Sequence, residues 1–370
     1  FGVRSLVIAE ILARVSRVCF FPRRFDGRRF AASLIFARDS ALILEPFCMA
    51  ETTNISWARS TWNPWIGCTK VGPGCDHCYA SVSTPARTMK VEWGAGKPRR
   101  RTSDQNWRQP LRWNEKARES GEPWSVFCSS LADVFDNEVP LDWRMDLFAL
   151  IQCTPHLTWL LLTKRIGNVK GMVSDLWWRT NPHVWLGATI VDQAEADRDI
   201  PKLLATPAAK RFVSYEPALG PVDWKDYWLI PSPSAAFQEG RVTPDMPDWT
   251  RIGAYALDWI IVGGESDQPG MKARPFDLAL ARSTVEQCKA AGVPVFMKQA
   301  GSFVVDRNDA GFDGCDPYSW PDGTDDKVIH DPFGIVERWQ GATIRVKLND
   351  RAGADPAEWP EDLRVREFPE

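Results

Sequence analysis

Three cysteines are grouped in a segment rich in glycine and proline. Cys68, Cys75 and Cys78 follow the spacing Cys-x6-Cys-x2-Cys. Thiolates at this density suit a soft metal or an iron–sulfur cluster better than a hydrophobic core. A structural zinc site takes four protein ligands, whereas a cluster held by three cysteines leaves one iron open to another ligand. The segment therefore predicts a metal or cluster site.

Short, continuous apolar runs alternate with helix-like stretches after Met49. Continuous runs are typical of parallel strands that are buried on both faces. The alternation of strand and helix predicts an α/β fold with parallel strands, as a partial or complete (β/α) barrel. The predicted strands are 125–128, 157–163, 184–188, 211–215, 259–262 and 293–297, and the predicted helices are 142–153, 194–205 and 276–291.

Polar residues follow the predicted strands at their carboxyl ends, where barrels of this class build their active sites. The cysteine segment follows a strand in the same way. Each residue alone also has a structural explanation, such as a helix cap, an ion pair or a glycine turn. Their convergence on one rim is what predicts a binding site. The candidates are Ser129, Ser130, Asp133, Lys164, Glu216, Gly263, Gly264, Glu265 and Lys298.

The composition is that of an ordinary globular protein. The chain has 370 residues, 44% of them hydrophobic and 25% charged. A net charge of −3 gives no global sign of nucleic-acid binding, and no apolar run is long enough to span a bilayer. Nine cysteines, an odd number, favour thiols in a reducing compartment over a disulfide framework. We therefore expect a cytoplasmic protein without a membrane partner.

The chain divides into three regions by composition. Residues 1–48 contain eight Arg, no Lys and four acidic residues, which is typical of a transit peptide. The alternative is a start assigned too far upstream, because the patterned sequence begins right after Met49. We expect this extension to lie outside the fold. Residues 49–303 are predicted to form the barrel, with an insertion at about 221–257, and residues 304–370 a C-terminal extension with a short strand at 342–347.

A basic segment interleaved with tryptophans covers residues 87–118. It holds ten Lys or Arg against three acidic residues, a local balance of +7, together with Trp93, Trp107 and Trp113. Basic groups contact phosphates and flat aromatic rings stack on unpaired bases, so this segment favours a nucleic-acid partner. A solvated basic face with the tryptophans packed inward explains the same residues.

Several segments resemble the radical SAM superfamily, and more closely a phage and prophage family of radical-SAM-like three-cysteine proteins. The common superfamily spacing is Cys-x3-Cys-x2-Cys, so the first interval is three residues longer here. The resemblance covers about residues 50–303 in the right order but does not assign a reaction. The matching segments are 57–79, 130–135, 162–165, 214–217, 259–266, 273–275 and 296–299.

The resemblance implies a [4Fe–4S] cluster on Cys68, Cys75 and Cys78, with S-adenosylmethionine on the open iron and an external electron donor. It places His77 beside the adenine, and Ser129 and Ser130 at the strand end that often carries a Gly-Gly-Glu motif for the methionine amine. Here Gly-Gly-Glu stands far downstream, at 263–265. The implied activity is a reductive cleavage of S-adenosylmethionine that modifies or repairs a substrate. Cys128 and Tyr215 are candidate catalytic residues, because both can form side-chain radicals and return a hydrogen atom.

The alternative is a non-catalytic zinc- or cluster-binding module that interacts with nucleic acid or a partner protein. Zinc would take the three cysteines and a fourth ligand. His77 is a poor fourth ligand because it is adjacent to Cys78, whereas Cys128 on the next strand is a better one.

Overall fold

The computed structural model describes residues 53, 55–229, 256–307, 327–331, 334–338 and 343–369. The predicted N-terminal extension, residues 1–48, and most of the predicted insertion, residues 230–255, lie outside this part of the chain. Within it, no helix combines the length and the apolar character that a bilayer crossing requires.

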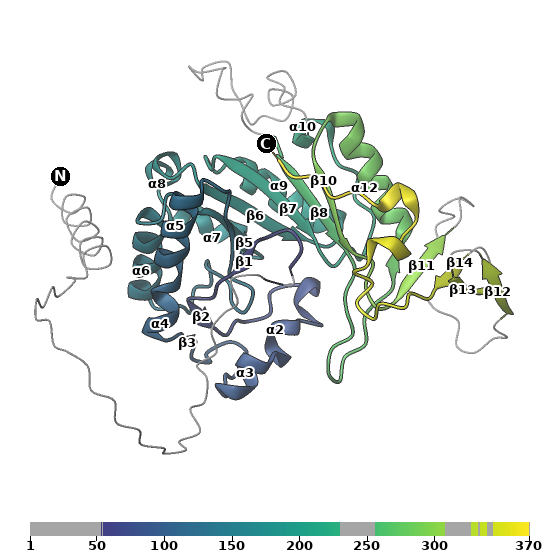
Figure 1. Ribbon diagram of the computed structural model, residues 1–370, viewed down its shortest axis with the longest axis horizontal. Coiled ribbons are helices and arrows are strands. Elements are labelled where there is room, and N and C mark those ends of the chain that lie inside the picture. The colour runs from purple at the N-terminus through teal and green to yellow at the C-terminus, as the bar shows by residue number, and fades with distance from the viewer. Residues whose placement is uncertain are drawn as a thin grey trace, which may run out of the picture.

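A seven-stranded sheet forms the centre of the fold (Figure 1). Every neighbouring pair in it is parallel, and β1 and β10 are its two edges, so the chain forms an α/β partial barrel. The predicted apolar runs coincide with six of its strands. In spatial order the strands are β1 (Ser60–Thr61), β4 (Ser125–Cys128), β5 (Thr158–Thr163), β6 (Val184–Ile190), β7 (Lys210–Tyr215), β8 (Trp259–Gly263) and β10 (Val295–Gln299).

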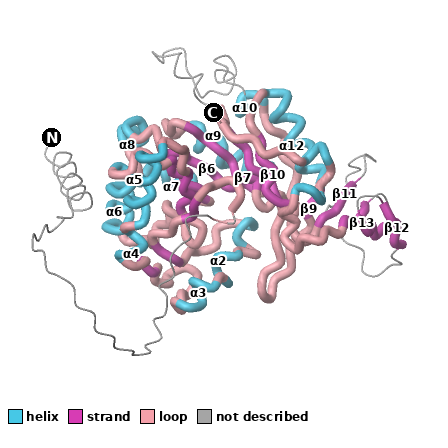
Figure 2. The backbone as a smooth tube through the Cα atoms, viewed as in Figure 1, coloured by secondary structure: helices cyan, strands magenta, loops and turns pink. Residues whose placement is uncertain are grey.

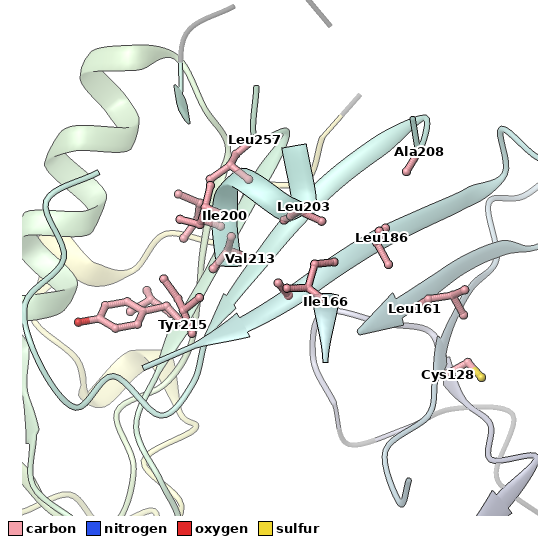
Figure 3. Packing of buried hydrophobic residues seen from close by; sticks show 14 of the residues in the cluster. Cys128, Leu161, Ile166, Leu186, Ile200, Leu203, Ala208, Val213, Tyr215 and Leu257 are labelled. Carbon is pink, nitrogen blue, oxygen red and sulfur yellow. The ribbon is translucent and has the colours of Figure 1, made fainter. Parts of the chain in front are cut away.

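Helices cover the outer face of this sheet. Ile166 of α7 and Ile200 and Leu203 of α9 pack with strand residues such as Leu161 and Leu186 (Figure 3). Burial of this apolar surface is the main force that holds the layers together. The principal helices are α5 (Gln109–Ser120), α6 (Leu141–Gln152), α7 (Ile166–Met172), α8 (Asp175–Thr180), α9 (Gln193–Leu204) and α12 (Leu278–Ala291).

The three predicted helices correspond to α6, α9 and α12. Helix α9 begins where the side chain of Asp192 accepts a hydrogen bond from the amide of Glu195. Helix α12 ends at Gly292, whose φ of 71° is left-handed and ends the helix without a Cβ clash. This helix starts two residues later than predicted, because Phe276–Asp277 form the short strand β9.

The inner face of the sheet carries a layer of aromatic residues, and polar residues lie nearer the carboxyl ends of its strands. Side chains alternate along each strand, so Phe127 and Phe212 face inward with Trp259 and Phe296, and Trp57 packs on them. At the next inward positions toward the carboxyl ends of the strands, Ser129, Ser214 and Lys298 are polar, whereas Ile261 of β8 is apolar. The aromatic layer therefore forms the floor beneath the polar end of the barrel.

Short elements connect the barrel strands on the side of the cysteine segment. Strand β2 pairs antiparallel with β3, and the cysteine segment follows β2 directly. These elements are β2 (Trp65–Ile66), η1 (Pro73–Cys75), α2 (Tyr79–Val82), α3 (Thr84–Thr88), β3 (Arg100–Arg101) and α4 (Asp104–Trp107). The short helix α10 (Asp226–Leu229) follows β7 and lies beside α12 instead (Figure 1).

A second sheet has the order β12-β13-β14-β11-β9 and stands at the right of the barrel (Figure 2). Its strand β14 confirms the strand predicted at 342–347. Beyond it the chain returns to the barrel, where the amide of Met297 in β10 donates to the carbonyl of Val365. The remaining elements are β11 (Val304–Arg307), β12 (Lys327–Asp331), β13 (Gly334–Arg338), β14 (Thr343–Val346), η3 (Pro356–Glu358) and η4 (Glu361–Leu363).

Candidate functional site

A cavity of about 140 Å³ opens at the carboxyl ends of the parallel strands. All three cysteines of the motif line it. Polar residues at or just after the carboxyl ends of five strands, β4 to β7 and β10, complete the lining. The strand ends thus bring together residues that lie far apart in sequence. Its polar lining includes Cys68, Cys75, Cys78, Tyr79, Ser129, Ser130, Asp133, Lys164, Arg165, Thr189, Ser214, Glu216 and Lys298.

Glycine and proline residues determine the backbone conformation of the cysteine loop. Gly67 has a φ of 112°, in the left-handed region, and turns the chain just before Cys68. Pro73 opens the short helix η1, which ends at Cys75. A Cβ on Gly74 would lie 2.9 Å from Cγ1 of Val191, so only glycine lets the loop approach the barrel this closely.

The three thiols are free and share the cavity. In the described ranges, no three His, Cys, Asp or Glu side chains are grouped as a metal ion would require. The three cysteines therefore line the same cavity, but they are not arranged around a common point as the ligands of a single metal ion would be.

Arg165 links the cysteine loop to the rim of the barrel. Its Nη1 donates to Sγ of Cys68 at 3.3 Å and to Oδ2 of Asp133 at 3.1 Å. Burial, reinforced by the nearby negative charge of Asp133, raises the pKa of the Cys68 thiol to about 12, and Arg165 opposes this rise. A thiolate at position 68 thus depends on compensating positive charge.

Asp133 is fully engaged by the protein itself. Its Oδ1 accepts from the hydroxyl of Thr163 at 2.8 Å and the amide of Phe135 at 2.9 Å. Its Oδ2 accepts from the amide of Lys164 at 3.0 Å as well as from Arg165. With both oxygens used, Asp133 orients its neighbours at the rim.

Glu216 and Lys298 form an ion pair beside the cavity. The Nζ of Lys298 lies 2.9 Å from Oε1 of Glu216, and Ser214 donates to Oε2 at 3.1 Å. Lys164 donates to the hydroxyl of Thr189 at 3.3 Å. Ser129 Oγ is buried and has no hydrogen-bond partner within the described residues, which leaves it available to a bound molecule.

The Gly-Gly-Glu segment does not line this cavity but contacts the cysteine loop. Oε2 of Glu265 lies 3.3 Å from Nδ1 of His77 and accepts from Nε of Arg274 at 2.9 Å. The two glycines allow close packing, because a Cβ on Gly264 would lie 2.5 Å from the carbonyl oxygen of Ala300. A Cβ on Gly263 would meet both Glu216 and the backbone of Gln299 at 3.0 Å.

A family model described as "Protein of unknown function (DUF5131)" matches residues 52–353, which include the whole cysteine loop and every cavity residue. The chain belongs to this DUF5131 family. The family description names no reaction. No curated protein matches the chain.

Solved structures similar to this DUF5131 chain include spore photoproduct lyase in three forms. A cysteine-to-serine mutant matches with a TM-score of 0.38 and 12% identity, covering 83% of this chain and 72% of that one. The complex with dinucleoside spore photoproduct matches with a TM-score of 0.34, 12% identity and the same coverage. A double mutant with bound AdoMet and dinucleoside spore photoproduct matches with a TM-score of 0.32 and 13% identity, covering 57% of this chain and 56% of that one. At these scores the likenesses carry no argument about reaction or substrate.

Cys128 and Tyr215, the candidate catalytic residues, lie on the opposite face of the sheet. Both belong to the packed layer between sheet and helices (Figure 3). The hydroxyl of Tyr215 donates to the carbonyl of Gly220, and burial raises the pKa of Cys128 above its usual range. Because neither side chain lines the cavity, we assign neither a role in chemistry there, and Cys128 is not placed to complete a zinc site in it.

The basic segment 87–118 of the DUF5131 chain divides between surface and interior. Arg99 is buried against Asp136, with Nη2 and Oδ2 2.7 Å apart, and Trp113 is also buried. Trp107 packs against Arg101, and Trp93 lines the cavity. The tryptophans are thus packed inward. The exposed cations are Arg87, Lys90, Lys97, Arg100, Arg108, Arg112, Lys116 and Arg118.

Arg165, Arg274 and Tyr79 were not among the predicted site residues. Arg165, directly after β5, and Arg274, between β8 and β9, both contact the cysteine loop. Tyr79 lines the cavity, and its hydroxyl donates to the carbonyl of Ser130 at 3.0 Å. The signals for Arg165 are its place directly after β5 and its inclusion in the matching segment 162–165. Contacts across the rim depend on how the strands curl, which spacing along the chain does not encode.

Proposed function

We propose that this chain is a radical-SAM-like iron–sulfur enzyme. Cys68, Cys75 and Cys78 would hold a [4Fe–4S] cluster that acts on S-adenosylmethionine. The observation that carries the proposal is that all three cysteines of the motif line one cavity at the carboxyl rim of a parallel partial barrel. Active sites of such barrels lie at this rim.

The donor set fits an iron–sulfur cluster. Soft thiolates are its usual ligands, and three of them leave one iron free to bind a further group. Single-electron reduction of S-adenosylmethionine is the chemistry that such a cluster supplies when bound, with an external protein as electron donor.

The protein side of this chemistry consists of charge, hydrogen bonds and exclusion of water. Arg165 offsets negative charge at Cys68. Ser129 Oγ, Lys164 and the Glu216–Lys298 pair offer donors and acceptors to a polar molecule in the cavity. Trp57 and Phe127 form an apolar floor that shields reactive species from water.

We propose a nucleic-acid substrate, contacted through the exposed cations of residues 87–118. Eight of the ten basic side chains in this segment are exposed, and such cations contact phosphates. Since the tryptophans face inward, this contact is electrostatic and has little stacking. Binding to single-stranded DNA or RNA should weaken steeply as salt rises. An Arg100→Glu/Arg112→Glu variant should lose affinity, and absence of binding at low salt in the unmodified chain would remove this part of the proposal.

The cluster is tested by measuring metal and sulfide after anaerobic reconstitution. We expect about four irons and four sulfides per chain, as in a [4Fe–4S] protein. Alanine at Cys68, Cys75 or Cys78 should abolish stoichiometric loading. Cys288→Ala is the matched control, because Cys288 is a free cysteine buried in α12. One zinc per chain, retained without sulfide, would support the metal-binding module instead.

A further inference from the structure

The long interval between Cys68 and Cys75 is held near both ends by arginines from two separate segments of the chain. Near the first end, Nη2 of Arg165 donates to the carbonyl of Thr69 at 2.5 Å, while Nη1 reaches Cys68. Near the second end, Nη2 of Arg274 donates to the carbonyl of Pro73 at 3.1 Å. Arg165 directly follows β5, whereas Arg274 lies in the segment between β8 and β9, so the loop is fastened at two separate places.

Each arginine is itself fixed by a buried carboxylate. Arg165 and Asp133 have side chains only 8% and 7% exposed. Glu265 is 9% exposed, and both of its oxygens accept from the guanidinium of Arg274, with Oε2 also accepting the Arg274 amide at 3.1 Å. The Arg274–Glu265 pair is bidentate, which fixes direction as well as position, whereas Arg165 reaches Asp133 through Nη1 alone.

Glu265 is anchored through its backbone. Its carbonyl accepts from the amide of Ser302 at 2.8 Å. A Cβ on Gly301 would lie 2.5 Å from the same carbonyl oxygen, so the backbone segments are in close contact. Glu265 therefore presents its carboxylate from a well-packed position to Arg274 and to His77 of the loop.

Between the two anchor points the loop is more exposed. Val71 has 51% of its surface exposed, and the loop closes on itself through Nζ of Lys70, which donates to the carbonyl of Asp76 at 2.9 Å. A loop of this length fluctuates among many shapes unless outside contacts restrict it. The two arginines supply such contacts.

We propose that Arg165 and Arg274 are positioning residues that clamp the cysteine loop and set the place of Cys68 relative to Cys75 and Cys78. This inference assigns the Gly-Gly-Glu segment to loop positioning through Arg274 and not to ligand contact. Its structural part is independent of the proposed function. Its consequence for cluster loading rests on that function.

The clamp is tested by amide hydrogen exchange of the full, metal-free chain under reducing conditions. Arg274→Met and Arg165→Met should each speed exchange within residues 68–78 several-fold. Exchange in β5 to β8 should stay at the unmodified rate, which separates a local clamp from general loss of stability. Arg274→Lys keeps the positive charge but loses the planar guanidinium that binds both oxygens of Glu265. It should therefore protect residues 68–78 from exchange better than Arg274→Met does, but less than the unmodified chain. Arg282→Met is the control, because Arg282 pairs with Asp306 and Asp362 outside the cavity lining.

Glu265→Gln and Asp133→Asn provide milder variants if an arginine variant does not fold. Each keeps the side-chain volume and weakens one clamp, so exchange in 68–78 should rise by a smaller factor. Exchange in 68–78 at the unmodified rate in the folded variants would overturn the inference. After reconstitution, Arg274→Met should also hold less iron than Arg282→Met. If the unmodified chain binds no iron, the proposed function fails while the exchange result still decides the clamp.

Discussion

Several charged side chains around the cavity form ion pairs of opposite charge. Arg165 faces Asp133, and Lys298 faces Glu216 with 2.9 Å between Nζ and Oε1. Side chains of the second pair are 23% and 11% exposed, so water screens them only in part. Removing one member of such a pair leaves the other charge poorly solvated, which costs more than the pair contributes.

Lys298→Met should therefore destabilise the protein by about 1–3 kcal/mol, less than for a fully buried pair because the cavity admits water. The measurement is the free energy of unfolding from urea titration. Adding Glu216→Gln should recover part of the loss, since the unpaired charge is then absent. Strictly additive effects of the two substitutions would show that the residues do not interact.

At the level of elements, the turn after β8 depends on two glycines that let three segments meet. A Cβ at Gly264 would lie 2.5 Å from the carbonyl oxygen of Ala300 and 2.7 Å from Cβ of Phe276. Both neighbours belong to packed structure, so neither can move without disturbing β10 or β9. This turn fixes the position of Glu265, which in its own position holds the side chain of Arg274.

Gly264→Ala should cost about 1–3 kcal/mol of stability, the usual range for overpacking a well-packed site. Gly171→Ala, in α7, is the control, because its Cβ would meet no atom within 4 Å and alanine favours a helix. Thermal unfolding of both variants checks this. A Gly264→Ala protein as stable as the Gly171→Ala protein would contradict the packing argument.

On the scale of the whole molecule, the C-terminal residues close one edge of the partial barrel. Val365 and Glu367 exchange backbone hydrogen bonds with β10, and Nε1 of Trp259 donates to the carbonyl of Glu367 at 2.9 Å. Phe368 packs against Trp259 and Phe296. An uncovered edge strand is a template for pairing with other chains.

A chain ending at Arg364 should lose about 2–4 kcal/mol, from three hydrogen bonds at roughly 1 kcal/mol each together with lost aromatic contact. It should also aggregate on heating at lower protein concentration than the full chain. Phe368→Ala keeps the hydrogen bonds and should cost less. Equal stability of the truncated and full chains, by urea unfolding, would show that the tail does not protect the edge.

Six of the seven barrel strands, three helices and the cysteine site could be proposed from sequence because each depends on local pattern. Continuous apolar runs marked the strands, and Gly292 marked the end of α12. The side-chain directions of Cys128 and Tyr215 were missed, since the pattern of a fully buried strand does not show which face is inside. The contacts of Arg165 and Arg274 with the loop were missed because they join segments far apart in the chain.

The central claim, that the cysteine cavity performs reductive chemistry on S-adenosylmethionine, is tested most directly without a substrate. The anaerobically reconstituted chain is mixed with dithionite and S-adenosylmethionine, and 5′-deoxyadenosine is measured by mass spectrometry. We predict that the unmodified chain and Cys288→Ala produce it, whereas Cys75→Ala does not. A chain that holds a full [4Fe–4S] cluster and yet forms no 5′-deoxyadenosine would contradict this account.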